Sequence, residues 1–112
     1  MSQTDGGMQA AELQKYKNEI KSFLDEQGRL ISYPAKRKRQ IFAFFYLASK
    51  FEPGRLYTEK EVNEILKAWH TFDDWAILRR ELLVCRFLCR KPDCSAYWLE
   101  AIQPAPASFG LA

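Results

Sequence analysis

Four adjacent cations, Lys36, Arg37, Lys38 and Arg39, stand at the start of a helix-like segment that runs to Lys50, with no acidic residue near them. A helix N-terminus carries a partial positive charge, so a cation in the first turn costs about 0.3 kcal/mol or more. This placement is easiest to explain if an anion such as a phosphate backbone neutralises the run. The alternatives are a solvated charge run or internal partners on a later predicted helix. The acidic residues of that helix are Glu59, Glu61 and Glu64.

A second basic block follows later in the chain. The stretch from Arg29 to Arg55 contains seven Lys or Arg residues and one acidic residue, and the stretch from Arg79 to Leu99 contains five and two. The segment between these stretches has two lysines and five acidic residues. If the fold brings the basic blocks onto one face, they form an electrostatic footprint for a polyanion such as double-stranded DNA. If it does not, the pattern serves solubility alone.

Three further groups of residues could do chemistry, but their spacing is a weak signal. Cys85, Cys89, Cys94 and His70 could hold a metal ion, yet the cysteine spacings differ from the close pairs of a zinc knuckle. Cys94 in its basic turn would need a stabilised thiolate to act as a redox thiol. His70 precedes two aspartates, but no nucleophile or oxyanion donor stands at a readable spacing, so a capping or core-edge histidine is favoured. We expect no catalytic residue, metal or cofactor, and no enzyme activity.

The elements that must position these residues begin with an amphipathic helix over residues 8–28, preceded by a disordered N-terminus over residues 1–7. We expect Gly28 to end this helix. Its apolar stripe could pack on the core of its own chain, or it could pack against the same stripe of a second chain and form a homodimer. The stripe consists of Leu13, Tyr16, Ile20, Phe23 and Leu24.

The rest of the sequence predicts one domain over residues 29–100, followed by a flexible tail over residues 101–112. A helix over residues 35–50 is apolar on almost all sides, which is typical of a buried central helix. Thr58 and Glu61 are spaced as a capping box for a helix that ends near Ala68. The next helix, over residues 73–85, can be capped by Thr71 or Asp73. Residues 86–90 and 96–99 flank a turn and predict a β-hairpin.

This element order predicts an α+β, mostly α fold that is winged-helix-like, with an extra N-terminal amphipathic helix. The helix over residues 73–85 would be the recognition helix and the hairpin would be the wing. Asp73 and Asp74 would repel phosphates at the start of that helix, so it approaches DNA by its middle or not at all. The helical step presents Arg79 and Arg80 together. Candidate nucleic-acid contacts are Lys36, Arg37, Lys38, Arg39, Arg79, Arg80, Arg86, Arg90 and Lys91.

Composition sets the remaining bounds. The chain has 112 residues, of which 47% are hydrophobic and 28% charged, as in globular domains. No apolar run approaches the ~20 residues of a membrane span. The first residues lack the order of a secretory signal, and an odd number of cysteines favours reduced thiols. We therefore expect a cytoplasmic protein that does not enter a membrane.

The chain also carries a series of ordered motifs, which are Tyr33–Lys38, Phe51–Arg55, Tyr57–Asn63, Trp69–Phe72, Leu78–Leu82 and Tyr97–Trp98. Together they resemble the bacterial domain of unknown function catalogued as number 2087, over about Arg29 to Leu99. The resemblance implies a bacterial cytosolic protein without established catalytic residues. Domains of that family also occur behind helix-turn-helix regulators of the arsenic-repressor type, which implies a role in transcription regulation. The hairpin turn of the family is usually Asp-Gly, whereas this chain has Asp93-Cys94 at a position where a positive φ favours glycine.

Two functions follow as expectations. The first is a DNA-binding or transcription-regulatory domain. The second is a non-catalytic protein-interaction or dimerisation module with the same fold. A group of aromatic residues around the last helix and the hairpin is expected to build the core rather than a stacking platform for single-stranded nucleic acid. These residues are Trp69, Phe72, Trp75, Tyr97 and Trp98.

Overall fold

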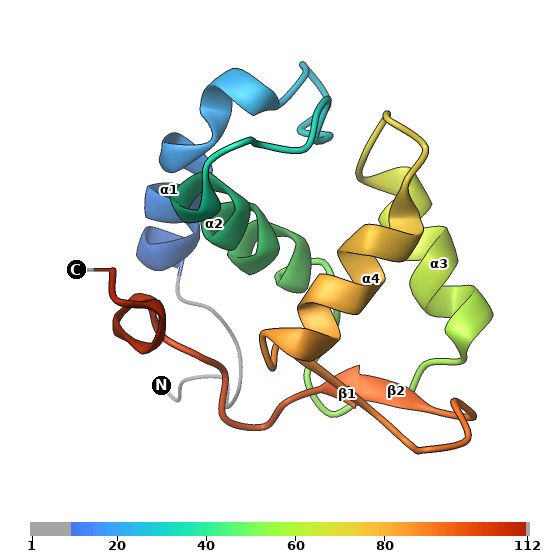
Figure 1. Cartoon of the computed structure of the whole chain (residues 1–112). Coiled ribbons are helices and arrows are strands. Elements are labelled where there is room, and N and C mark those ends of the chain that lie inside the picture. Colours follow the sequence, from blue (N-terminus) through green and yellow to red (C-terminus); the bar gives the residue numbers. More distant parts are fainter. Residues whose placement is uncertain (1–9, 112) are drawn as a thin grey trace.

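The computed structural model describes residues 10–111, and in that range the protein is α+β and mostly helical, with a single two-stranded antiparallel sheet (Figure 1). The elements are α1 (Ala10–Glu19), η1 (Lys21–Phe23), α2 (Arg37–Ala48), α3 (Glu59–Ala68), α4 (Trp75–Val84), β1 (Leu88–Arg90), β2 (Tyr97–Leu99) and η2 (Pro106–Phe109), where η marks a short 3-10 helix. Each described helix is too short or too polar to cross a bilayer. The disorder expected for residues 1–7 lies outside the described residues.

α2 is the centre of the core, as its apolar residues on almost all sides predict. Every residue from Ile41 to Ala48 is buried. α1 and α4 both pack against α2, and α4 also packs against α3 (Figure 1). The Phe45 ring illustrates how the elements meet: it stacks on Tyr16 of α1 at 4.5 Å between centroids and meets Phe87, just before β1, edge-on at 4.8 Å.

The N-terminal helix is shorter than its apolar stripe predicts. α1 ends at Glu19, and after the turn of η1 the chain is extended at Leu24, which pairs with Leu30 in an antiparallel bridge. The carboxylate of Asp25 accepts hydrogen bonds from backbone N–H groups of the following turn, including that of Arg29 at 2.8 Å. Such local side-chain bonds compete with helix formation, which explains why the helix does not continue to residue 28.

Gly28 belongs to this turn and does not end a helix as predicted. Its φ is +80°, a conformation that residues with a Cβ adopt at a cost. A Cβ at this position would lie 2.8 Å from the Tyr46 hydroxyl. The same hydroxyl donates a hydrogen bond of 2.6 Å to the Gly28 carbonyl, so glycine lets the turn sit directly on α2.

Side-chain caps begin the next two helices. The Thr58 hydroxyl accepts from the N–H of Glu61, and the Glu61 carboxylate accepts from the N–H of Thr58, so the capping box of α3 is confirmed. The cap of α4 is Asp74, whose carboxylate accepts from an N–H of the first turn. The prediction of Thr71 or Asp73 as the cap is wrong, since α4 begins later and Asp73 has a φ of +56°.

His70 ties the end of α3 to the start of α4 and is buried. Its Nδ1 bonds to a carbonyl one turn earlier in α3, and its Nε2 accepts from the N–H of Asp74 at 2.9 Å. Leu30 supports the same connection, because its backbone bonds to Trp69 on one side of His70 and to Thr71 on the other. The prediction of a capping or core-edge histidine is therefore confirmed.

A hairpin after α4 completes a winged-helix-like order of elements. β1 and β2 are antiparallel, with Arg90 opposite Tyr97. Tyr57, just before α3, forms two backbone hydrogen bonds of 2.8 Å with Tyr97 and adds a one-residue strand to the sheet. β1 begins at Leu88, later than predicted, because Arg86 has a φ of +70° and is not extended.

The C-terminal segment, which is expected to be a flexible tail, makes specific contacts with the core. The Gln103 amide donates to the carbonyls of Phe87 at 3.0 Å and Glu100 at 2.9 Å. Further along, η2 places Phe109 on the ring of Phe87, with 5.9 Å between centroids. These contacts join residues far apart in the chain, so local periodicity does not predict them.

Cys94 occupies the hairpin position that suits glycine. Its φ is +64°, and its N–H closes the turn by donating to the Lys91 carbonyl at 2.8 Å. A left-handed conformation costs a residue with a Cβ about 1 to 2 kcal/mol. Glycine avoids this cost, but it loses about 0.5 to 1 kcal/mol because it has more conformational freedom in the unfolded chain. We expect Cys94→Gly to raise the free energy of unfolding by about 0.5 to 1 kcal/mol in urea denaturation. Ser95→Gly is the control, because Ser95 is not left-handed; an equal gain there would contradict the assignment.

Candidate nucleic-acid interface

α4 turns one side outward, and this side is the candidate recognition surface (Figure 1). Leu78 and Leu82 are fully buried on the inner side of α4. A step of about 100° per residue then places Ala76, Arg80 and Val84 on the outer side, and Val84 is 63% exposed. The outer side of α4 therefore carries one cation among apolar residues.

Arg79 and Arg80 are not presented together, contrary to the prediction from the helical step. Arg79 is turned toward α3, where its Nη1 donates to the Asn63 side chain and lies 3.7 Å from the Glu59 carboxylate. Arg80 is exposed and forms no ion pair with any residue that the structure describes. Arg79 thus links α3 to α4, and Arg80 alone is available on the outer side of α4.

A depression of about 400 Å³ lies between α4 and the hairpin. Tyr97 donates to the Glu59 carboxylate at 3.0 Å in its wall, and burial, together with this carboxylate, raises the pKa of Tyr97 to about 12. Three arginines and one carboxylate line the depression, so it has a positive excess that suits an anion such as phosphate. It is lined by Glu59, Arg79, Arg80, Leu83, Val84, Arg90, Cys94 and Tyr97.

The cations of the hairpin differ in their partners. Arg90 curls over its own turn, since its Nη1 donates to the carbonyls of Lys91 and Pro92 and lies 2.9 Å from the Cys94 sulfur. Lys91 is exposed, with no ion pair inside the described range. Arg86 lies 3.8 Å from the Glu100 carboxylate. Arg90 and Lys91 remain candidate contacts with an anion, and Arg86 already has a carboxylate partner.

The basic run at the start of α2 is half neutralised inside the molecule. Arg37 bonds to the Glu81 carboxylate of α4 at 3.2 Å. Arg39 donates to the backbone carbonyl of Glu19 at 2.7 Å and lies 3.3 Å from its carboxylate. The internal partners are therefore on α1 and α4, and the prediction of Glu59, Glu61 and Glu64 is wrong. Lys36 and Lys38 are exposed and form no ion pair with described residues.

The two basic blocks lie on neighbouring sides of α4. Arg37 meets α4 at Glu81 and at the Cys85 sulfur, 3.5 Å away. Arg80 is turned about 100° from Glu81 around the helix axis, and Val84 lies between them. The blocks therefore flank the C-terminal half of α4 without forming one continuous face, so the condition of a single shared basic face is not met. Any case for an anion-binding surface then depends on the second block, whose Arg80 and Arg90 line one depression.

The cysteines do not meet at a metal site. No cluster of three or more His, Cys, Asp or Glu side chains that could hold a metal occurs among residues 10–111. Burial, reinforced by the hydrogen bond to the Glu100 carboxylate, raises the pKa of Cys89 to about 11. Burial also raises the pKa of Cys85. Both thiols stay protonated at neutral pH and are weak nucleophiles.

Four of the five aromatic residues expected in the core, Trp69, Phe72, Trp75 and Tyr97, pack as core or core-edge side chains, whereas Trp98 is partly exposed and is not packed against the core. Tyr97 is buried, and Trp69 and Trp75 are partly buried against the core. The Lys50 ammonium lies 3.9 Å from the Trp69 ring centroid, and the Lys67 ammonium lies 4.3 Å from that of Trp75. These cations cover the rings of Trp69 and Trp75, so those two rings are not open for stacking.

Sequence reasoning did not identify Glu59, Leu83 and Val84 as parts of the site. Glu59 lines the depression because it begins α3 beside the hairpin, where the Tyr97 hydroxyl donates to its carboxylate. Val84 is exposed, although Leu78 and Leu82 of the same helix are fully buried. The burial of those two leucines fixes the rotation of α4 and leaves Val84 outside. No local pattern in the sequence determines how α4 is rotated about its axis.

A family model matches most of the domain just described. The model is described as an uncharacterized protein conserved in bacteria (DUF2087), and it matches residues 29–99. This range contains α2, α3, α4 and the hairpin. The match confirms the resemblance that the ordered motifs predict. No curated protein and no solved structure matches the chain.

Alanine substitutions are expected to separate Arg79 from Arg80. Arg79→Ala removes the bond to Asn63 and the ion pair with Glu59, so the free energy of unfolding should fall by about 1 kcal/mol. Arg80→Ala removes an exposed side chain and should change it by less than about 0.5 kcal/mol. Urea denaturation measures both, and equal losses would contradict the orientation of Arg79.

Proposed function

The chain belongs to the DUF2087 family, whose description assigns no activity, and we propose that it is a DNA-binding domain with a role in transcription regulation. The proposal depends on the site, because folds of this kind host many functions. One observation carries it: Arg80 of α4 and Arg90 of the hairpin line the same depression beside the outward side of α4.

The proposed mode of docking uses the C-terminal half of α4 and the hairpin. Asp73 and Asp74 are exposed at the other end of the helix, where they would repel phosphates. Arg80 would reach a base edge or a phosphate, and Arg90 and Lys91 would contact the backbone. The duplex would therefore meet α4 at its middle and C-terminal turns.

The start of α2 would supply auxiliary backbone contacts. Lys36 and Lys38 are exposed, and the ion pair of Arg37 with Glu81 places this segment beside the C-terminal half of α4. Arg37 and Arg39 hold the segment in place rather than bind the nucleic acid. The positive charges at the N-terminus of α2 are thus accounted for. The two arginines have internal carboxylate partners, and the two lysines are available to phosphate.

The number of available cations limits the affinity. Each phosphate contact contributes about −0.9 to the slope of log K against log salt, so four or five contacts give a slope of about −4. The affinity would then fall by about two orders of magnitude between about 50 and 200 mM salt. The available cations are Lys36, Lys38, Arg80, Arg90 and Lys91.

A bacterial cytoplasmic location is part of the proposal. Cys85, Cys89 and Cys94 are free thiols, and free thiols persist in a reducing compartment. DNA is present in the same compartment of a bacterial cell.

A second candidate function is a protein-interaction module, which the exposed Val84 on α4 favours. A partner could cover this apolar side chain between Arg80 and Arg37. Self-association through the N-terminal helix is less favoured, because Tyr16 and Ile20 of its stripe are buried against their own chain. Sedimentation at two concentrations tests the self-association version, which a monomer at both would contradict.

Titration of a labelled mixed-sequence duplex, followed by fluorescence anisotropy, tests DNA binding. We expect wild-type binding that weakens with salt as given above. Arg80→Glu combined with Lys91→Glu should weaken binding by at least about tenfold at low salt, because it removes two contacts and adds two repulsions.

Lys15→Glu is a single charge-reversal control, since Lys15 is an exposed lysine of α1 outside the proposed surface. It should change the affinity by much less than the double variant. The proposal is wrong if no duplex binds at any salt concentration, or if Lys15→Glu weakens binding as much as the double variant.

A further inference from the structure

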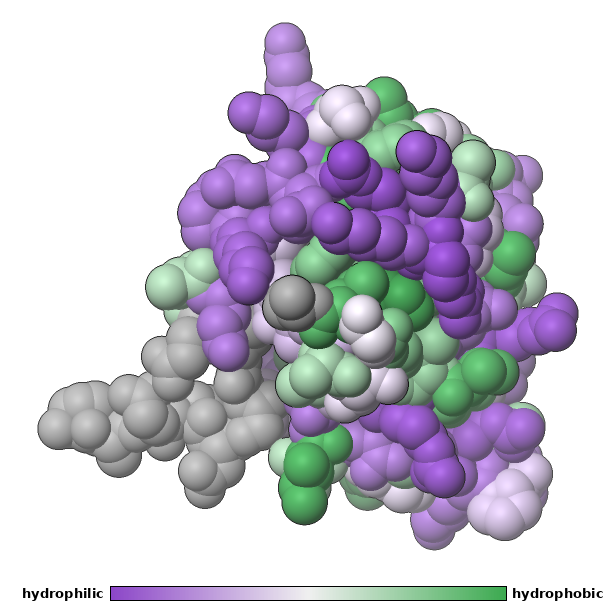
Figure 2. Space-filling view, turned by 60° about the vertical axis from the view of Figure 1, so that its left-hand side comes forward, coloured by the Kyte–Doolittle hydropathy of each residue, from purple (hydrophilic) through white to green (hydrophobic). Residues whose placement is uncertain are grey.

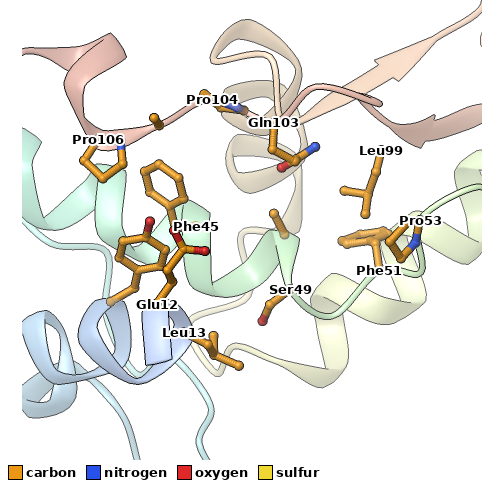
Figure 3. A pocket seen from close by; sticks show the side chains of 13 residues that line it. Glu12, Leu13, Phe45, Ser49, Phe51, Pro53, Leu99, Gln103, Pro104 and Pro106 are labelled. Atoms are coloured by element: carbon orange, nitrogen blue, oxygen red, sulfur yellow. The ribbon is translucent and has the colours of Figure 1, made fainter. Parts of the chain in front are cut away.

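The C-terminal segment closes a cavity of about 410 Å³ over α1 and the C-terminal end of α2 (Figure 3). Sites for small molecules typically have volumes of about 300 to 1,000 Å³. None of the candidate nucleic-acid contacts lines this cavity. An inference from it therefore stands apart from the proposed DNA binding.

The wall of the cavity is largely apolar, and contacts behind it hold its rings in place. Phe45 is stacked on Tyr16, and Phe51 meets the Tyr57 ring edge-on at 5.3 Å between centroids. Figure 3 shows Phe51 and Leu99 at one end of the cavity and Phe45 at the other. On the side of the molecule that carries α1 and the C-terminal segment, Figure 2 shows hydrophobic surface in the middle, bordered by hydrophilic side chains. A pre-formed apolar wall of this kind is typical of small-molecule sites.

The cavity offers a ligand no free charge. Among the described residues that line it, Glu12 is the only charged one, and Glu12 already interacts within the chain. A charged ligand would lose hydration here without gaining a free opposite charge. The cavity therefore favours a neutral molecule.

Gln103 is the polar side chain that can orient such a molecule. Its amide nitrogen donates to the carbonyls of Phe87 and Glu100, and turning the amide over would set its oxygen against both carbonyl oxygens. The two hydrogen bonds therefore fix the amide, and its oxygen faces away from them. Figure 3 shows this oxygen on the side of the cavity. It accepts no hydrogen bond from residues 10–111, so it is available to a ligand.

The rest of the wall is poor in groups that could donate to a ligand. Ser49 donates its hydroxyl proton to the Tyr46 carbonyl. The Tyr16 hydroxyl can donate or accept, so it does not decide the preference. Three prolines of the wall have no N–H. These are Pro53, Pro104 and Pro106. The available Gln103 oxygen therefore favours a ligand that brings its own donor.

We propose that this cavity binds a neutral small molecule with a flat apolar body and one N–H or O–H donor. The apolar body lies among Phe45, Phe51 and Leu99, and the donor bonds to the Gln103 amide oxygen. An apolar wall with one placed polar group matches the usual division of work in ligand pockets.

Two other occupants are outcomes of the test. Residues 1–9, which lie outside the described range, could cover the cavity, and so could a second copy of the chain. In either case the full chain would bind no probe at the cavity. That result would overturn the proposal.

The test uses the full chain and two neutral probes of nearly the same shape. Indole has a ring N–H that donates, whereas benzofuran has an acceptor oxygen at the same position. Amide shifts in nitrogen-15 correlation spectra locate and quantify binding. We expect both probes to shift the residues that line the cavity, and indole to bind about two- to tenfold more tightly, because one hydrogen bond distinguishes them. Equal affinities, or shifts away from the cavity, would overturn the proposal.

Two charged probes with the same ring test the preference for a neutral ligand. Tryptamine adds a positive charge to indole, and indole-3-acetate adds a negative one. Both should bind more weakly than indole, because neither charge finds a free partner in the cavity. Tighter binding of either would contradict a neutral ligand.

A substitution at Gln103 tests its role. Gln103→Met removes the acceptor with little change in side-chain size, so the preference for indole over benzofuran should disappear. The matched control is Gln27→Met, on an exposed glutamine that does not line the cavity, and it should keep the wild-type preference. A preference that survives in folded Gln103→Met would overturn the assignment. If that variant does not fold, the wild-type comparison of indole with benzofuran still decides.

Discussion

Burial of α2 on every side is the constraint from which the rest of the structure follows. Fully burying one large apolar side chain contributes about 1.5 to 3 kcal/mol, and α2 buries every residue from Ile41 to Ala48. A helix of this kind must be covered all round, so α1, α4, the segment before β1 and the C-terminal segment each supply part of the cover. α4 can then face inward only with Leu78 and Leu82, and this rotation decides which of its residues reach the surface.

The same constraint explains the basic run at the start of α2. The helix emerges from the core between the ends of α1 and α4, where Glu19 and Glu81 meet Arg39 and Arg37. Partly exposed ion pairs of this kind contribute about 0 to 1 kcal/mol each, so they position the segment more than they stabilise it. A run of cations that resembles an anion site in the sequence therefore serves two purposes. Its arginines are structural partners of acidic neighbours, and its lysines remain at the surface.

The sequence predicts those features that local chemistry determines. The capping box of Thr58 and Glu61, the buried character of α2 and the hairpin after α4 follow from spacing and residue type. The end of α1 does not, because it depends on Leu24 pairing with Leu30 and on the hydrogen bonds of Asp25. Arg79 and Phe109 were also misjudged, since their contacts with α3 and with Phe87 depend on tertiary packing.

We propose that the C-terminal half of α4 and the hairpin together form a surface for DNA. The most direct test is to map the backbone amide shifts of the full chain with a short mixed-sequence duplex at low salt. We expect the shifts to concentrate at Arg80 to Val84 and at Arg90 to Cys94, with smaller changes at Lys36 to Lys38. Shifts confined to α1 and the C-terminal segment, or no shifts at all, would contradict it.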